Sequence, residues 1–128
     1  MHMHIEPGLT ADLSTLVTPE NTAAAIGAGG VEVFATPMMI ALMENAAWRA
    51  VAAGLDKGNI TVGTLVNVRH LAATPVGQTV RASATLQEID ERRLVFHVEA
   101  HDEHQKIGEG MHERVIVGLE RFMKRLEE

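Results

Sequence analysis

A single carboxylate, that of Glu44, lies inside the most apolar helical stretch of this sequence, residues 36–50. A helix this apolar is expected to be buried, and carboxylates are almost never fully buried without a partner. Burial in apolar surroundings raises the pKa of a carboxyl group towards the range in which it exchanges protons near neutral pH. Glu44 is therefore a candidate acid or base. The alternative is a solvent-facing position beside the apolar stripe that contains Met43 and Ala47.

Five further residues are candidates to meet near this helix if the strands that follow pack against it: Thr36, Gly63, Thr64, His70 and Arg114. His70 is a candidate base, although a lone histidine at the end of an apolar strand face is more often structural. Gly63 is either a bulge or a backbone N–H donor to a developing oxyanion, a role in which Thr64 would assist. Thr36 is either a helix cap or a catalytic hydroxyl. Arg114 is either a surface ion-pair partner or part of the site.

The remaining histidines carry less weight, because His97, His101, His104 and His112 lie in or beside expected hairpins. The spacing of His101 and His104 is compatible with a pair of metal ligands. No second matched pair accompanies them, so no metal site is predicted.

The helix that carries Glu44 is predicted over residues 37–53. Thr36 is expected to be its N-cap, with Pro37 at the first helical position, where the missing N–H costs nothing. Gly54 is expected to end it. The glycine-rich residues 26–30 precede a short extended segment, 31–35, and are candidates for a mobile lid.

After residue 58 the apolar pattern changes from a helical period to strict alternation, which predicts four strands. The first, 61–70, is expected to place Val62, Thr64, Val66, Val68 and His70 on one face. The second, 78–89, places its small apolar residues, from Val80 to Leu86, on one side. Short turns join these to strands 94–101 and 107–117, which predicts an antiparallel meander. Residues 10–18 are expected to form an edge strand, and the tail from Leu119 a short helix or a continuation of the last strand.

One alanine-rich helix wrapped by an antiparallel sheet is an α+β arrangement, the hotdog fold. The 128 residues form one such domain, with residues 1–9 expected to be poorly ordered. A sheet of this size leaves open edges, so pairing with a second copy is expected.

Composition excludes several classes of function. The net charge of −6 comes without a dense lysine and arginine cluster, and 3% aromatic residues offer few stacking surfaces, so nucleic acid is not an expected partner. No apolar run approaches the roughly 20 residues that span a bilayer, so no membrane association is expected. The absence of cysteine excludes a thiol nucleophile and favours the cytoplasm.

Three motifs, in residues 33–44, 62–77 and 100–114, resemble the hotdog-fold thioesterase family that includes fluoroacetyl-CoA thioesterase. The resemblance covers residues 10–125. It implies a homodimer, with a tetramer as the alternative, that hydrolyses acyl-CoA thioesters near the subunit interface without a cofactor. It also assigns roles: Thr36, Glu44 and His70 would form the catalytic set, Gly63 would face the thioester carbonyl, and Arg114 belongs to the His-Glu-Arg motif.

The chain departs from the fluoroacetyl-specific enzyme in one respect, because residues 18–33 contain no aromatic side chain to form a lid. The acyl pocket is instead expected to be lined by Met38, Met39 and Met43, whose flexible side chains adapt to different groups.

The leading hypothesis is hydrolysis of a small or short-chain acyl-CoA. Glu44 and His70 would serve as acid and base, or Glu44 would attack directly and form an anhydride. Two alternatives share the fold: a non-catalytic module that binds acyl-CoA, and a hydratase. The joint presence of an ionisable Glu and His favours the enzyme over the binder. The hydratase is weaker, because its paired Asp and His motif is not evident.

Overall fold

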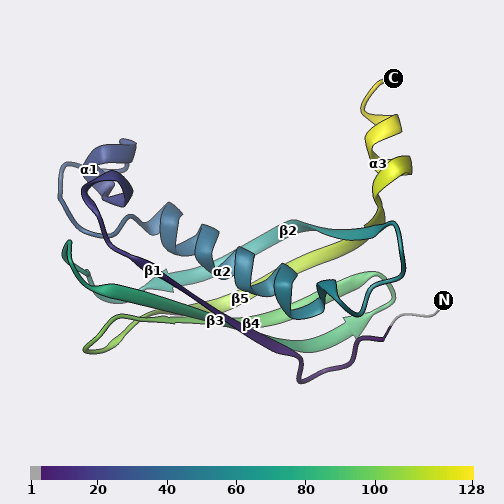
Figure 1. The fold of residues 1–128 in the computed structure, drawn as a ribbon, viewed down its shortest axis with the longest axis horizontal. Coiled ribbons are helices and arrows are strands. Elements are labelled where there is room, and N and C mark those ends of the chain that lie inside the picture. Colours follow the sequence, from purple (N-terminus) through teal and green to yellow (C-terminus); the bar gives the residue numbers. More distant parts are fainter. Residues whose placement is uncertain (1–3) are drawn as a thin grey trace.

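The protein was analysed as a computed structural model, which describes residues 4–128. A five-stranded sheet carries one long helix on one face (Figure 1). The elements are β1 (Thr10–Leu16), η1 (Pro19–Asn21), α1 (Ala23–Ile26), α2 (Thr36–Ala52), β2 (Asn59–His70), β3 (Thr79–Asp90), β4 (Arg93–His101), β5 (Lys106–Gly118) and α3 (Leu119–Arg125). This is the predicted α+β arrangement.

The sheet is antiparallel throughout and has the strand order β1-β3-β4-β5-β2. The meander β3-β4-β5 forms its centre, as the short turns predicted, and β1 lies at one edge as expected. The prediction is wrong for β2 (Asn59–His70), which was expected to lie beside β3 in the same meander but pairs with β5. The other edge is β2, which pairs only with β5 among the described strands. One side of β2 is therefore open for pairing with another chain.

Helix α2 begins one residue earlier than predicted, and Thr36 is not its cap. The N-cap is Ala35, which makes no side-chain capping bond, while Thr36 and Pro37 occupy the first helical turn. The helix ends at Ala52, and Gly54 does not adopt a left-handed conformation. Gly54 is required for another reason: a side chain there would collide with the backbone of His4, whose N–H donates to the Gly54 carbonyl at 2.7 Å. The start of the chain is thus held against the helix from residue 4 on, whereas residues 1–3 of the segment expected to be poorly ordered lie outside the described part.

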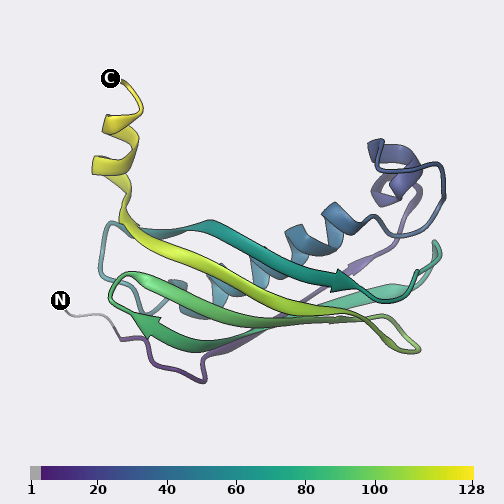
Figure 2. The ribbon, with the colours of Figure 1, turned by 180° about the vertical axis from the view of Figure 1, so that it is seen from behind.

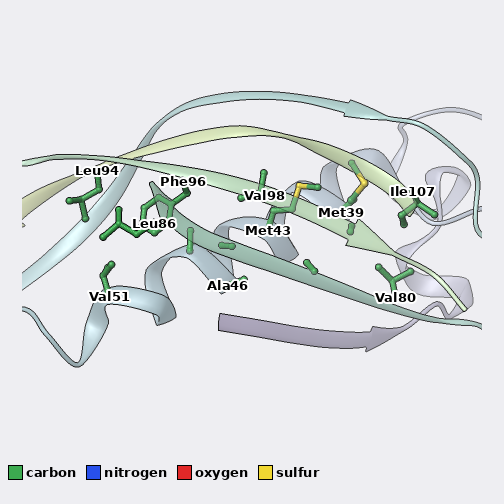
Figure 3. Close-up of a cluster of buried hydrophobic side chains, with 14 of the residues drawn as sticks. Met39, Met43, Ala46, Val51, Val80, Leu86, Leu94, Phe96, Val98 and Ile107 are labelled. Carbon is green, nitrogen blue, oxygen red and sulfur yellow. The ribbon is translucent and has the colours of Figure 1, made fainter. Parts of the chain in front are cut away.

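The core lies between α2 and the sheet (Figure 3). Small residues on β3, such as Ala82 and Ala84, let the helix approach closely, and larger side chains such as Phe96 fill the space beyond. Met39 and Met43, expected in the acyl pocket, are fully buried in this core, and Met38 packs against its margin.

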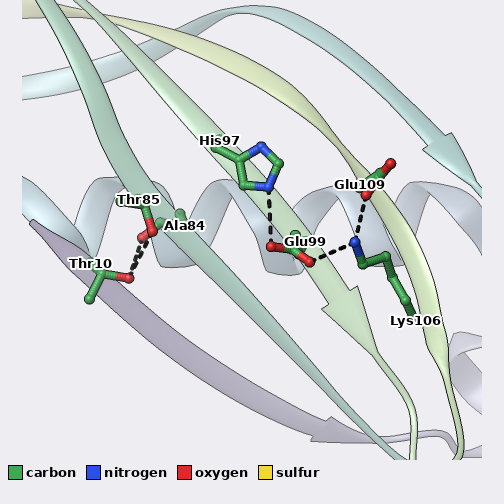
Figure 4. Close-up of polar contacts among 7 residues, drawn as sticks. All are labelled: Thr10, Ala84, Thr85, His97, Glu99, Lys106 and Glu109. Carbon is green, nitrogen blue, oxygen red and sulfur yellow. Dashed lines mark hydrogen bonds and ion pairs between the residues drawn. The ribbon is translucent and has the colours of Figure 1, made fainter. Parts of the chain in front are cut away.

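The opposite face of the sheet has no helix over it among the described elements (Figure 2). It carries a polar network in which Lys106 bridges Glu99 and Glu109 at 3.0 and 2.7 Å, and His97 contacts Glu99 at 3.1 Å (Figure 4). Solvated ion pairs of this kind explain why the strands alternate between apolar and polar residues. Within residues 4–128, no helix has the length and apolar character needed to cross a membrane.

A β-bulge changes which residues of β2 face the helix. The register shifts between Gly63 and Leu65, so that Gly63 pairs with Arg114 and Leu65 with Glu113, and Thr64 is the extra residue. Val66 and His70 keep the predicted face. The prediction is wrong for Val62 and Thr64, because the bulge reverses the alternation before it and brings Gly63 to the helix side instead.

Candidate active site

The first group of candidate residues is a pair formed by Thr36 and His70. His70 is the last residue of β2 and Thr36 the first of α2, and the Thr36 hydroxyl lies 2.7 Å from Nδ1 of His70. This contact links the start of the helix to the end of the strand. The hydroxyl is free for it because the helix does not use Thr36 as its cap.

Burial lowers the pKa of His70, and this effect outweighs the opposing influence of the Ala72 backbone. Nε2 of the ring is buried and has no hydrogen-bond partner of good geometry within the described residues. The imidazole is therefore neutral near pH 7, the state in which it accepts a proton. The pair borders a hollow of about 340 Å³ that is lined by Phe34 and by several alanines, among them Ala23 and Ala28.

A second group surrounds Glu44 and comes from three elements. The carboxylate oxygen Oε2 lies 3.7 Å from Nη1 of Arg114 and 3.9 Å from Nε2 of His112, both on β5. A Cβ added to Gly63 of β2 would lie 2.7 Å from the same oxygen. The β2 backbone thus comes close to the Glu44 carboxylate at Gly63, because glycine has no side chain to keep them apart.

Arg114 is held in place by three hydrogen bonds. Nε and Nη2 donate to the hydroxyl and carbonyl of Thr61 at 2.8 and 3.0 Å, and Nη1 donates to Nε2 of His112 at 3.2 Å. The residue is only 7% exposed, and although burial lowers its pKa, a guanidinium stays charged. Of the two alternatives for Arg114, the surface ion pair does not hold, because the residue is buried and presents a fixed cation to Glu44.

His112 is neutral, and its two ring nitrogens link the β2 backbone to Arg114. Its Nδ1–H donates to the Leu65 carbonyl at 2.8 Å, so that Nε2 is the acceptor for Arg114. Burial is the largest cause that lowers the pKa of His112, and Arg114 adds to it. The Leu65 carbonyl and the carboxylates of Glu44 and Glu113 oppose the shift without reversing it.

The surroundings of Glu44 differ from those predicted. Its side chain is 39% exposed, and it lies against a cation rather than in an apolar pocket. Part of the alternative expectation, a position beside the apolar stripe, is met, since Met43 is buried in the core and Glu44 is not. The feature that marks Glu44 as a site residue is its contact with Arg114 and Gly63.

Sequence reasoning gave His112 too little weight by treating it as a hairpin residue. It lies in the middle of β5 and is 1% exposed. The signal was present, because residues two apart on a strand share a face, so any site that includes Arg114 includes His112. Sequence reasoning gave Thr64 more weight than His112. Thr64 is the bulge residue, and its hydroxyl donates to the Glu113 carbonyl at 3.3 Å.

The two groups lie apart within one chain. Thr36 and Glu44 are eight residues apart on α2, or about 12 Å along the helix axis. Gly63 and His70 are seven residues apart on β2, or about 20 Å when the bulge residue Thr64 is left out. The candidate catalytic set is therefore divided between two places in one subunit. In residues 4–128, no group of three or more His, Cys, Asp or Glu side chains is arranged to hold a metal ion, and this includes His101 and His104.

Comparison with known proteins gives consistent matches. The family model for fluoroacetyl-CoA-specific thioesterases matches residues 17–120. The fluoroacetyl-CoA thioesterase of Streptantibioticus cattleyicolor is 48% identical over 91 residues, which cover 71% of this chain and 66% of that protein, just under two thirds of its length.

Solved structures agree with this. A threonine-to-alanine variant of a fluoroacetyl-CoA thioesterase, in complex with fluoroacetate, has a TM-score of 0.89 and 37% identity over 96% of this chain and 97% of its own. A thioesterase superfamily member from Thermus thermophilus has a TM-score of 0.87 and 34% identity, with 96% and 93% coverage. A hot-dog-like protein from Thermanaerovibrio acidaminovorans shares the fold, with a TM-score of 0.87 at 24% identity over 95% and 90% of the two chains. The chain therefore has the hotdog fold and belongs to the fluoroacetyl-CoA-specific thioesterase family.

Proposed function

We propose that this protein hydrolyses the thioester bond of a small or short-chain acyl-CoA, releasing a carboxylic acid and CoA. The observation that carries the proposal is the 2.7 Å contact between the Thr36 hydroxyl and Nδ1 of a neutral, half-buried His70. The names of its relatives support the same reaction. A chain without cysteine that acts on acyl-CoA fits the cytoplasm, as predicted from the sequence.

In the proposed reaction, an oxygen nucleophile adds to the thioester carbonyl, the carbon–sulfur bond breaks, and the thiolate of CoA leaves. His70 takes the proton of the attacking water, and Thr36 orients the imidazole or that water. The N–H of Gly63 stabilises the oxyanion. Glu44 either assists the proton transfers or attacks first, forming an acyl anhydride that water then opens. Arg114 holds the carboxylate in position for either route.

The acyl group that this site takes is proposed to be small but not restricted to fluoroacetyl. The family resemblance implies an aromatic lid in an enzyme specific for fluoroacetyl-CoA, whereas the segment before α2 has no aromatic residue at positions 18–33 and carries Gly27, Gly29 and Gly30. The hollow beside Thr36 and His70 is bordered by alanines from this segment. Met38, at the margin of the core, is the methionine best placed to contact an acyl chain.

We infer that the working unit is a homodimer that joins its sheets along β2. This edge is open and exposes Leu65 and Val66, which are 43% and 41% exposed. Antiparallel pairing of two β2 strands about a two-fold axis near Val66 and Asn67 would place Gly63 of one copy opposite His70 of the other. Such a pairing brings Glu44 of one subunit towards the Thr36 and His70 pair of its partner, and so unites the divided set.

Thiol release from a panel of short acyl-CoA substrates tests the function. Glu44→Ala and His70→Ala should each lower turnover by about a hundredfold or more, while circular dichroism shows that both variants are folded. His104→Ala, which removes an exposed histidine of the β4–β5 turn that belongs to neither group, is the control. A Glu44→Ala variant with full activity would overturn the proposed role, and a wild-type protein that binds acyl-CoA without releasing thiol would be a binding module instead.

Mixing the two inactive variants tests the shared site. After exchange of subunits, half of the dimers contain one copy of each variant, and one of their two sites is intact if Glu44 and His70 come from different subunits. Activity should then recover to about a quarter of the wild-type value. A site contained within one chain predicts no recovery.

A further inference from the structure

A hollow of about 480 Å³ lies where β5 passes into α3. Helix α3 projects from this end of the molecule (Figures 1 and 2). Three arginines line it, Arg92 from the turn before β4 and Arg121 and Arg125 from α3. We propose, on the basis of the function proposed above, that this arginine cavity binds the phosphorylated nucleotide end of the acyl-CoA substrate.

The charge of the cavity points to an anionic ligand. Its eight lining residues include three arginines and no acidic residue, in a protein whose net charge is −6. Arg81 and Arg93 elsewhere in the sheet lie within 4 Å of carboxylates. Within residues 4–128, none of the three cavity arginines has such a partner. Like charges that converge without a counterion repel one another, so an anion of the substrate would stabilise this arrangement.

The backbone fixes the position of the arginines. Arg121 and Arg125 are one turn apart on α3, and therefore project from the same side of the helix. The first residue of α3, Leu119, donates its N–H to the Gly58 carbonyl at 2.9 Å, which holds the helix against the loop before β2. Arg92 contacts the Ile116 carbonyl at 3.3 Å from the neighbouring turn. The three side chains are exposed to solvent and open to a ligand.

A second cavity lies between this place and the candidate active site. It has a volume of about 340 Å³, is mainly apolar, and is bordered by Trp48 and Leu55. It shares Asn59 with the arginine cavity and reaches Arg114, the partner of Glu44. Asn59 and Gly63 are four residues apart on β2, or about 13 Å. The uncharged pantetheine arm of CoA has the length and character to follow this route from the thioester to the nucleotide.

The cavity fits a nucleotide better than a carrier protein. Its volume lies in the range of about 300–1,000 Å³ that is typical of small-molecule sites. Guanidinium groups bind phosphate oxygens in pairs, and CoA carries phosphates at two places on its nucleotide. Phe122, which also lines the hollow, offers an aromatic surface to the adenine ring. A carrier protein brings a single phosphodiester on a convex surface.

Steady-state kinetics with two substrates test the proposal. Arg121→Gln and Arg125→Gln should each raise KM for acetyl-CoA by about tenfold, with kcat unchanged and with no effect on acetyl-pantetheine, which lacks the nucleotide. The matched control is Lys124→Gln, which removes the same charge from the same helix but does not line the cavity. Equal effects of all three variants, or equal losses with both substrates, would overturn the proposal. The proposal would also be overturned if the wild-type protein turned over an acylated carrier protein and the Arg121→Gln and Arg125→Gln variants lowered that turnover but not the turnover of acetyl-CoA.

Calorimetry separates this inference from the proposed hydrolysis. CoA and adenosine 3′,5′-bisphosphate should bind the wild-type protein and the Lys124→Gln variant about equally, and the Arg121→Gln and Arg125→Gln variants about tenfold more weakly. That result supports the arginine cavity even if no thiol is released. Hydrolysis of acetyl-CoA with unchanged nucleotide binding in the arginine variants would keep the function and refute the cavity.

Discussion

The close approach between Gly63 and Glu44 makes Gly63→Ala a direct test of the candidate active site. A Cβ at this position would lie 2.7 Å from Oε2 of Glu44, 3.3 Å from Cε1 of His112 and 3.4 Å from Nη1 of Arg114. Ordinary contact begins near 3.4 Å, so the carboxylate oxygen must retreat by about 0.7 Å. His112 and Arg114 cannot make room, because each is held by hydrogen bonds to the backbone of β2.

A displacement of this size is large for a catalytic group, because misplacement by about 1 Å costs on the order of a hundredfold in rate. We therefore expect Gly63→Ala to lower kcat/KM for a short acyl-CoA by about 10- to 100-fold, measured by thiol release. Stability should change little, since the backbone of Gly63 does not require glycine and the end of the Glu44 side chain is free to turn outward. The control is Ser14→Ala, a small exchange at an exposed position of the edge strand β1 that lies in neither group. Activity within twofold of wild type would show that Glu44 has no role at this position.

Two further predictions concern the residues around the two groups. Thr36→Val should lower kcat by about 10- to 100-fold, while Thr36→Ser should stay within a few fold of wild type, because only serine keeps a hydroxyl on His70. If Thr36 served as a helix cap instead, Thr36→Val would lower the free energy of unfolding by about 1 kcal/mol in a urea titration. For His112, whose pKa is lowered in the folded state, the unfolded chain takes up the proton first as the pH falls below about 6.5. The free energy of unfolding should then fall by up to about 1.4 kcal/mol per pH unit until the lowered pKa is reached. His112→Asn should flatten this slope in urea titrations at several pH values, and the exposed His104→Asn should not; equal slopes in all three proteins would contradict the argument.

The sequence was sufficient to predict the layers and the central strands, because their physical cause is local. Alternation from Val80 to Leu86 places small side chains under the helix, and the structure buries all of them. Three errors arose where a long-range contact decides the outcome. The first is the place of β2, which pairs with β5 rather than with the next strand along the chain. The bulge at Thr64 inserts one residue without altering the hydrophobic pattern, and so reverses the predicted face of Val62. The start of α2 has no side-chain capping bond, because the N-cap is Ala35 and the Thr36 hydroxyl contacts His70 instead.

The same distinction between local and long-range causes applies to the site residues. Glu44, His70, Gly63 and Arg114 were identified from their types and from the family motifs, but the grouping of Glu44 with β5 and of Thr36 with the end of β2 needed coordinates. Composition also suggested the wrong reason for treating Glu44 as a site residue. An apolar helix was taken to imply a buried carboxylate, whereas a partly exposed carboxylate beside a buried cation has the same sequence.

That buried cation explains why His112 must be neutral. Nε2 accepts a hydrogen bond from Arg114 only while it carries no proton, because protonation would place a second positive charge 3.2 Å from the guanidinium. Burial lowers the pKa of His112 and so protects this bond at pH values where an exposed histidine would be charged. The Leu65 carbonyl enforces the same tautomer from the other side of the ring. When the pH falls far enough to protonate His112, the proton both destabilises the fold and pushes Arg114 away from the position in which it meets Glu44. We therefore expect protonation of His112 to lower the stability and to disturb the contact between Arg114 and Glu44 together, in addition to the protonation of His70 that would remove the proposed base.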